Sequence, residues 1–175
     1  MQETLFECRT IQTRENLKEM TARLYRTQLI IHAVALTVLA LAFLIFVIAS
    51  GRTSYLPFAL ILLFAFGGVS AYRFESVPTK YSDKVYSQSV KLRGEASSGV
   101  MKADETSISH ENEQTRVTKV YEYGELTAVR ETKNLFLLKT EAKTWLMIDK
   151  RNFTTGTPED FGALLREKTG SAKKR

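Results

Sequence analysis

The sequence predicts an α+β protein in which a two-helix transmembrane hairpin is followed by a small antiparallel β sheet or barrel that a C-terminal helix caps. Two long uncharged runs, 29–49 and 53–72, are separated by only a few turn residues. Short apolar runs at regular spacing follow from residue 99, and an amphipathic segment with clear start and stop signals ends the chain. A length of 175 residues allows one modest domain beside the hairpin.

The first apolar run is long enough to cross a membrane as a helix. No charged side chain lies between Arg26 and Arg52. At about 1.5 Å per residue, the run spans a hydrocarbon core of ~30 Å, and it lacks the polar stripe of a helix on a soluble protein. A cleaved signal peptide is the alternative, but the run begins far along the chain and exceeds a typical h-region. We expect a span over about 28–50.

The second apolar run predicts a partner helix over about 55–72. Pro57 falls in its first turn, where a missing N–H is tolerated. The connector 51–55 has room only for a turn, so the two helices must be antiparallel neighbours. Helices are required because lipid offers no hydrogen-bond partner to the backbone. The hairpin as a whole should cover 27–72.

Basic residues near the spans set the expected orientation. Lys and Arg flank the outer ends of both runs, whereas the turn has only Arg52. Under the positive-inside rule, both termini should therefore be cytoplasmic, in a multi-pass protein of the cell inner (plasma) membrane. The juxtamembrane residues expected to face anionic headgroups are Arg23, Arg26, Arg73, Lys80 and Lys84.

Two features inside the hairpin have more than one interpretation. Gly67 and Ala71 form a small-xxx-small pattern that would let the two helices pack closely, although small residues are common in membrane helices anyway. His32 lies inside the first span, where an ionisable group suggests function. With no second ionisable residue in the spans, a neutral histidine near the interface is the simpler interpretation.

The N-terminal segment 1–26 should form a strand and then a helix that leads into the membrane. The β-forming residues of 3–11 indicate a strand that must pair with something downstream. Thr13 is a suitable N-cap for the helix. Cys8, the single cysteine, is either a reactive or lipidated thiol or a half-buried strand residue acting as a small apolar side chain.

After the hairpin, a polar stretch precedes a series of short strands. Residues 73–98, with Pro78 and a Gly/Ser-rich end, are expected to be a juxtamembrane linker or a short helix over 82–92. The apolar runs that follow, separated by turn residues, predict an antiparallel sheet or small barrel. The expected strands are 100–103, 107–109, 116–123, 128–132, 135–138 and 145–148.

The expected C-terminal domain covers residues 99–170, and a helix at its end should close its core. Thr157 is placed as N-cap with Pro158 at the first helical position, and Gly170 ends the helix. A helix that covers the open side of a bent sheet is the arrangement of pleckstrin-homology-like (PH-like) domains. The remaining residues, 171–175, form a basic tail.

A resemblance to a known family follows from the order of these elements. The residues that match are Tyr123, Leu126, Val129 and Glu131, then Leu135-Phe136-Leu137-Leu138, then 148–153, and then Phe161 and Leu165. The chain resembles the bacterial YcxB-like protein family. The resemblance implies a two-span membrane protein with a PH-like C-terminal domain. It implies no catalytic residues, and because many relatives have proline at the position of Asp149, no binding role transfers to that turn.

The sequence contains none of four common catalytic and nucleotide-binding motifs, which argues against the enzyme classes that use them. The sequence has no HExxH, GxxxxGK[ST], GxGxxG or GxSxG motif. We therefore expect no enzymatic activity, cofactor or metal. The net charge of +6 falls mainly in the membrane flanks and the basic tail, which argues against nucleic acid as a partner. Candidate contacts to an anion or lipid headgroup are Arg130, Lys133, Lys150 and Arg151, with a solvated strand edge as the alternative.

Three functional hypotheses remain. The first is a non-enzymatic integral membrane protein that presents a PH-like module at the inner leaflet, where it binds a protein segment or an anionic lipid headgroup. The alternative is a membrane regulatory or immunity-type protein that acts through transmembrane helix contacts. A small transporter or channel ranks last, because two almost uniformly apolar helices supply no pore lining.

Overall fold

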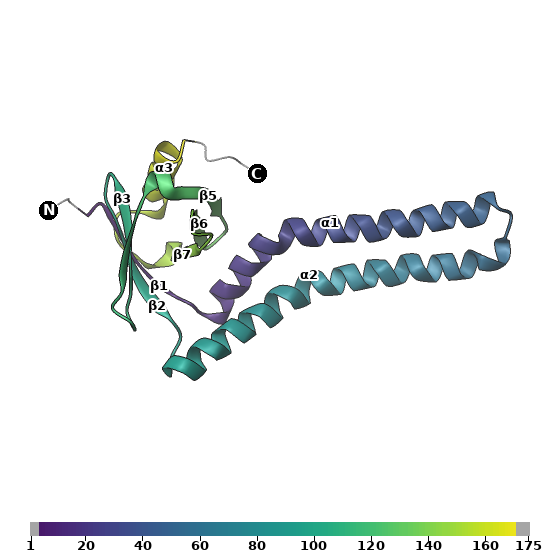
Figure 1. Ribbon diagram of the computed structural model, residues 1–175, viewed down its shortest axis with the longest axis horizontal. Helices are drawn as coiled ribbons and strands as arrows, with labels where there is room; N and C mark the ends of the chain where they lie inside the picture. The colour runs from purple at the N-terminus through teal and green to yellow at the C-terminus, as the bar shows by residue number, and fades with distance from the viewer. Residues whose placement is uncertain (1–3, 171–175) are drawn as a thin grey trace. The chain divides into compact units, whose positions relative to one another are not determined.

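The computed structural model describes residues 4–170 and contains two compact units. One unit, named the hairpin below, is Thr21–Tyr81. The other, named the domain, combines the described residues up to Met20 with those from Ser82 onward. Figure 1 shows the elements of both units in chain order.

The hairpin is formed by two long antiparallel helices. They are α1 (Arg14–Ala49) and α2 (Leu56–Arg93), joined by a turn and the short 3-10 helix η1 (Thr53–Tyr55). The rings of Phe43 and Phe58 lie 6.2 Å apart near the turn. The rings of Tyr25 and Tyr81 lie 6.1 Å apart near the open end. The two helices therefore stay side by side along their length.

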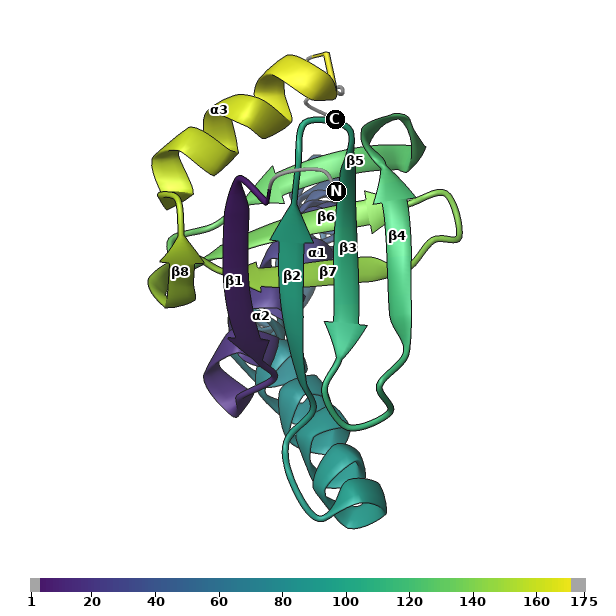
Figure 2. The same ribbon diagram turned by 90° about the vertical axis from the view of Figure 1, so that its left-hand side faces the viewer.

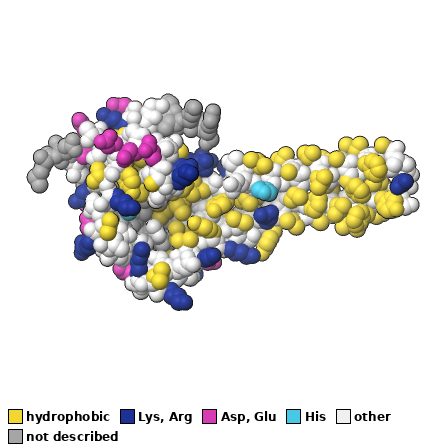
Figure 3. Space-filling model, in the orientation of Figure 1, with side chains coloured by type: hydrophobic (Ala, Val, Ile, Leu, Met, Phe, Trp, Pro, Cys, Tyr) yellow, Lys and Arg dark blue, Asp and Glu magenta, His cyan; other side chains and the backbone are white. Residues whose placement is uncertain are grey.

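A narrow seam holds the two helices together. Between residues 29 and 47 of α1, the less exposed positions recur mainly at intervals of four and three residues, which is the spacing of a coiled-coil seam. The positions in this series are Leu29, Ala33, Leu36, Ala40, Phe43 and Val47. Most other side chains of the hairpin are apolar and exposed, as Figure 3 shows in yellow. Both helices are long and apolar enough to cross a membrane, as the sequence predicted.

The expectation of a linker over 73–98 was wrong, whereas the alternative, a helix over 82–92, is confirmed as part of a longer helix. Helix α2 continues unbroken to Arg93, with Pro78 inside it. A proline in a helix removes one hydrogen bond and costs about 3 kcal/mol, but contacts to α1 favour the helix here. Arg14 lies 3.7 Å from the Asp83 carboxylate and over the ring of Tyr86. Tertiary contacts thus outweigh the local helix-breaking signal.

The domain has two antiparallel sheets and a helix. The larger sheet has the order β4-β3-β2-β1-β8 and the smaller one the order β5-β6-β7. Figure 2 shows β5–β7 running across the back of β1–β4, with α3 alongside. The bounds are β1 (Phe6–Ile11), β2 (Ser98–Ala103), β3 (Ser107–Asn112), β4 (Thr118–Glu122), β5 (Leu126–Glu131), β6 (Leu135–Thr140), β7 (Trp145–Asp149), β8 (Phe153–Thr155) and α3 (Pro158–Lys168).

The hairpin is inserted into the domain rather than placed before it. Strand β1 pairs with β2 in antiparallel register from Phe6↔Ala103 to Ile11↔Ser98. The predicted downstream pairing of the N-terminal strand is therefore confirmed. The division into a leading segment 1–26 and a domain 99–170 needs correction, because β1 is an inner strand of the domain's larger sheet. Together, the two candidate membrane helices therefore form the connection between the neighbouring strands β1 and β2.

The core lies between the two sheets and α3. Phe161 of α3 is fully buried, and its ring packs on those of Phe6, Phe136 and Phe153 at 5.4–5.6 Å. The predicted cap is confirmed, since the Asp160 N–H donates to the hydroxyl of Thr157.

One expected strand is shorter than predicted, and one strand was not predicted. The strand expected over 116–123 is shorter, and Val117 at its start is exposed. Tyr123 instead starts the 3-10 helix η2 (Tyr123–Glu125) and donates from its hydroxyl to the Asp104 carbonyl at 2.8 Å. Strand β8 was not predicted, because three residues are too short a segment to show a pattern.

Candidate functional site

Two of the four candidate anion contacts are bound to carboxylates of the domain. Arg151 follows β7 and forms a bond of 2.8 Å with Asp149. Lys150 lies 2.6 Å from the Glu131 carboxylate and donates to the Thr132 carbonyl. Positive charge at these two positions is therefore largely neutralised within the domain.

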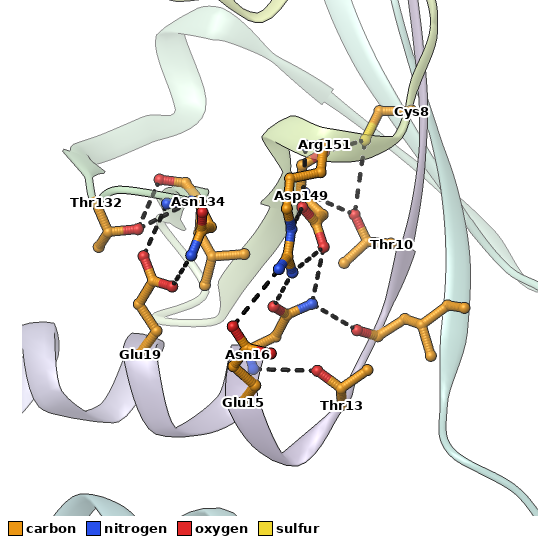
Figure 4. A network of polar contacts seen from close by, with 12 residues as sticks. Cys8, Thr10, Thr13, Glu15, Asn16, Glu19, Thr132, Asn134, Asp149 and Arg151 are labelled. Carbon is orange, nitrogen blue, oxygen red and sulfur yellow. Dashed lines mark hydrogen bonds and ion pairs between the residues drawn. The ribbon is translucent and has the colours of Figure 1, made fainter.

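Asp149 is the centre of a buried polar cluster, drawn in Figure 4. Its side chain is almost fully buried, as is that of Asn16 in the first turns of α1. The Asp149 carboxylate accepts hydrogen bonds from the backbone and guanidinium of Arg151 and, at 3.0 Å, from the amide of Asn16. Asn16 in turn accepts from Arg151 at 2.6 Å. The buried polar groups of Asp149, Asn16 and Arg151 therefore all have hydrogen-bond partners, as a stable polar cluster requires.

The electrostatics keep this carboxylate ionised. Burial alone opposes ionisation, but the hydrogen bonds and charge of Arg151 and the bond from Asn16 outweigh it, so the pKa of Asp149 is lowered. The hydrogen bonds to Asp149 raise the pKa of Arg151. A second carboxylate, Glu15, lies 3.6 Å from the same guanidinium. The site therefore has no surplus of positive charge.

A second set of hydrogen bonds, here called a clasp like the Asn16–Asp149 contact, joins α1 to the domain one turn further along the helix. The Glu19 carboxylate accepts from the backbone and side-chain N–H groups of Asn134, both at 2.9 Å. Burial opposes its ionisation, but the hydrogen bonds from Thr132 and Asn134 prevail and lower the pKa of Glu19. The first turns of α1 are thus fixed to the β5–β7 sheet at two points, before the helix enters its apolar stretch.

The environment of Cys8 favours the structural interpretation of this residue. Cys8 is fully buried, and its thiol donates to the Asp149 carbonyl at 3.0 Å. Burial raises its pKa to about 11. A protonated, inaccessible thiol is a poor nucleophile and a poor acceptor for a lipid. Thr10, two residues on, accepts from the Asp149 N–H and helps to join β1 to β7.

The other two candidate anion contacts lie elsewhere on the small sheet. Lys133 is exposed in the turn between β5 and β6. The guanidinium of Arg130 lies over the Trp145 ring, 5.5 Å from its centroid, and the Lys139 ammonium lies 5.9 Å from the same centroid. No local sequence pattern predicts this grouping, because the three residues meet only through strand register.

The hairpin residues singled out from the sequence are all accessible. The five juxtamembrane cations, Arg23, Arg26, Arg73, Lys80 and Lys84, have exposed side chains. Gly67 and Ala71 are exposed as well, and a Cβ added to Gly67 would meet nothing within 4 Å. The expectation that these two residues pack the two helices against each other was therefore wrong. The seam lies on a neighbouring face of α2, at positions such as Ala59.

His32 lies near the start of the apolar part of α1. From the two ring pairs that align the helices, His32 is level with the 69–74 stretch of α2, which contains Arg73. Its Nδ1 atom lies 2.7 Å from the Gln28 carbonyl one turn earlier. Across residues 4–170, no three His, Cys, Asp or Glu side chains come together as metal ligands would.

The basic tail 171–175, including Lys173, Lys174 and Arg175, lies outside the described residues. Sequence reasoning missed Asn16, Glu19 and Asn134. Asn16 and Asp149 are separated by 133 positions, and no local pattern announces such a pairing.

Part of the chain is similar to a known protein family. Residues 104–165, from the turn before β3 to α3, match the model of the family described as YcxB-like protein. The resemblance seen in the sequence is confirmed over that segment. A crystal structure of the C-terminal domain of an unknown protein from Leishmania infantum is similar at 15% identity and a TM-score of 0.33, covering 49% of this chain and 96% of that one. No curated protein matches the chain.

Proposed function

We propose that this chain is a non-enzymatic integral membrane protein whose hairpin tethers a PH-like module to the cytoplasmic face of the inner membrane. The observation that carries the proposal is the exposure of the hairpin's apolar side chains. Phe64 is 77% exposed, Ile45 65% and Ile61 63%. Water would oppose such a surface at roughly 25 cal/mol per Å² of apolar area, whereas lipid tails solvate it.

The arrangement of the domain supports a PH-like module. Four strands, β1–β4, form a consecutive antiparallel series, and β5–β7 form a second sheet that crosses it. Helix α3 then closes the core through Phe161. The role that we propose for this domain is to bind a protein segment or a lipid headgroup.

Because the hairpin is inserted between two strands, two chain segments connect it to the domain. Strand β1 leads into α1 after two residues, and α2 ends four residues before β2. The two clasps, Asp149 with Asn16 and Glu19 with Asn134, hold the start of α1 to the domain. Each end of the hairpin is therefore attached to the domain by a short segment of chain.

The orientation follows from the basic flanks, and labelling of introduced cysteines tests it. Cys8 is buried and gives little background. We expect Ser54→Cys, in η1, to react with a membrane-impermeant maleimide in intact cells. Glu141→Cys, in the exposed turn after β6, should react only after the membrane is permeabilised. Labelling of Glu141→Cys in intact cells would reverse the topology, and a chain that stays in solution without detergent would refute the membrane assignment.

The alternative function, a regulatory or immunity-type partner acting through transmembrane contacts, is supported by one observation. Gly67 and Ala71 face away from the seam and leave a shallow surface for another helix. Under this alternative, Gly67→Leu abolishes crosslinking to a membrane partner, whereas Ala35→Leu, at an exposed position of α1, does not. Under the tether function, both variants keep their crosslinks.

A further inference from the structure

Trp145, Arg130 and Lys139 lie together on the outer face of the small sheet. Lys139 of β6 is directly opposite Trp145 of β7 in the strand register. Arg130 of β5 is opposite Leu137, the next position of β6 on the same face. The result is an indole ring with two cations beside it, Arg130 at 5.5 Å and Lys139 at 5.9 Å from its centroid. We name these three residues the Trp145 patch.

We propose that the Trp145 patch binds the headgroups of anionic phospholipids in the inner leaflet. This inference rests on the proposed function, because it requires the domain to be held beside a bilayer. It differs from the contacts expected from the sequence, since Lys150 and Arg151 bind carboxylates of the domain and take no part.

The chemistry of the patch fits a lipid surface. Trp145 is partly exposed, and an indole with one apolar and one polar side is the side chain that prefers the zone between lipid tails and water. Arg130 and Lys139 supply positive charge beside the ring for phosphate oxygens. Lys143, in the turn that leads into β7, adds a further exposed cation, and Glu141 in that turn is the acidic residue among them.

The position of the patch in the domain also fits. The outer face of the small sheet is the face on which the first turns of α1 are fixed. Asp149 and Trp145 are four positions apart on β7, so their side chains share that face. Asn16 binds at Asp149, and Leu17 beside it is buried. The patch is therefore on the same sheet face that receives the helix leading to the membrane.

Trp145 is the single tryptophan of the chain, so its fluorescence reports on this site alone. The experiment uses the full chain in nanodiscs of phosphatidylcholine, with or without phosphatidylglycerol. We expect phosphatidylglycerol to shift the emission to the blue and to reduce acrylamide quenching about two-fold. High salt should reverse both effects, because charge attraction is screened.

Matched variants separate the patch from general attraction to the lipid. Lys139→Gln should abolish the difference between the two lipid compositions. Lys119→Gln, an exposed lysine of β4 with the same change of charge, should leave it intact. An equal loss in both variants would overturn the proposal.

Other outcomes distinguish the patch from the tether. If the wild-type chain enters the nanodiscs but Trp145 responds identically to both lipids, the headgroup site is refuted and the membrane tether stands. If the chain does not enter nanodiscs, the proposed function itself fails. Protection of Trp145 by inorganic phosphate in phosphatidylcholine discs, equal to that by phosphatidylglycerol, would assign the patch to a soluble anion and also overturn the proposal.

Discussion

The hairpin and the domain contain the same apolar side chains but place them differently. In the domain, Phe161 is fully buried and contacts three other phenylalanine rings. In the hairpin, Phe64 is 77% exposed although it belongs to a regular helix. The two helices touch along a seam only one or two residues wide, with small side chains such as Ala40 and Ala59 buried in it.

This difference indicates what stabilises each region. The domain follows the rule for proteins in water, in which apolar burial drives folding. The hairpin buries little, so in water its helices would expose an apolar surface without compensation. Between helices in lipid there is no hydrophobic driving force, and close packing at small residues takes its place. Substitutions of the same residue type in the two regions should therefore have very different consequences.

The largest contrast is expected for the two phenylalanines. Phe161→Ala leaves a cavity at the centre of the domain core and should lower its free energy of unfolding by about 3–5 kcal/mol. Phe64→Ala removes a side chain from an exposed helix face and should change stability by less than about 0.5 kcal/mol. Thermal unfolding of the detergent-solubilised chain, followed by Trp145 fluorescence, measures the effect on the domain.

Circular dichroism at 222 nm supplies the control for this pair. The long helices dominate that signal. In Phe161→Ala, the midpoint of the Trp145 fluorescence transition should therefore fall to a lower temperature, at which most of the helical signal remains. Simultaneous loss of both signals would mean that the hairpin depends on the domain for its fold, and the contrast between the regions would be wrong.

A second contrast concerns glycine. Gly156, between β8 and α3, has φ of +73°, and a Cβ there would overlap the ring of Phe6 and lie 3.0 Å from the Leu5 carbonyl oxygen. Gly156→Ala should therefore destabilise the domain by about 2–3 kcal/mol. Gly67→Ala meets open space in a helix and should change stability by less than about 0.5 kcal/mol. Chemical denaturation measures Gly156→Ala through Trp145 fluorescence and Gly67→Ala through circular dichroism at 222 nm, and equal losses of stability would contradict the open face at Gly67.

Local patterns predicted the parts of this structure that depend on neighbours in sequence. The cap at Thr157, the helix over the first apolar run and the strands β6 and β7 were all found in this way. Pro78 shows the limit of the same reasoning. A helix-breaking residue predicted a linker, but contacts of Tyr81 with Tyr25 across the hairpin favour continuation of α2.

Features that depend on distant pairings were not predictable from one sequence. The pattern of 3–11 predicted a strand, yet nothing in it specified β2 as the partner across the whole hairpin. The Trp145 patch arises because register places Lys139 opposite Trp145. The Asp149 cluster likewise needs β1, α1 and β7 to meet. Of the four basic candidates, only Arg130 belongs to the Trp145 patch, because strand register and not charge decides which cations lie beside the indole.

The smallest expected effect, and the one most specific to the domain, is a dependence on acid that passes through Asp149. Its pKa is lowered in the folded domain, so ionised Asp149 stabilises the fold at pH values above about 3.9, the usual pKa of the unfolded side chain. That contribution is lost as the pH falls through the lower, folded pKa. Asp149→Asn should cost about 1–2 kcal/mol at pH 7, because it removes charge-assisted hydrogen bonds to a half-exposed guanidinium.

Asp149→Asn removes one of the carboxylates that titrate in acid. The free energy of unfolding of this variant should therefore fall less steeply than that of the wild type below about pH 4. Glu19 keeps part of the acid dependence in both proteins, since its pKa is lowered as well. Residues 27–72 contain no Asp or Glu, so acid has no carboxylate to titrate within the spans. Lowering the pH should therefore unfold the region around Trp145 while the helical signal of the spans persists. If the spans lost their helical signal at the same pH in lipid, the hairpin would not be independent of the domain.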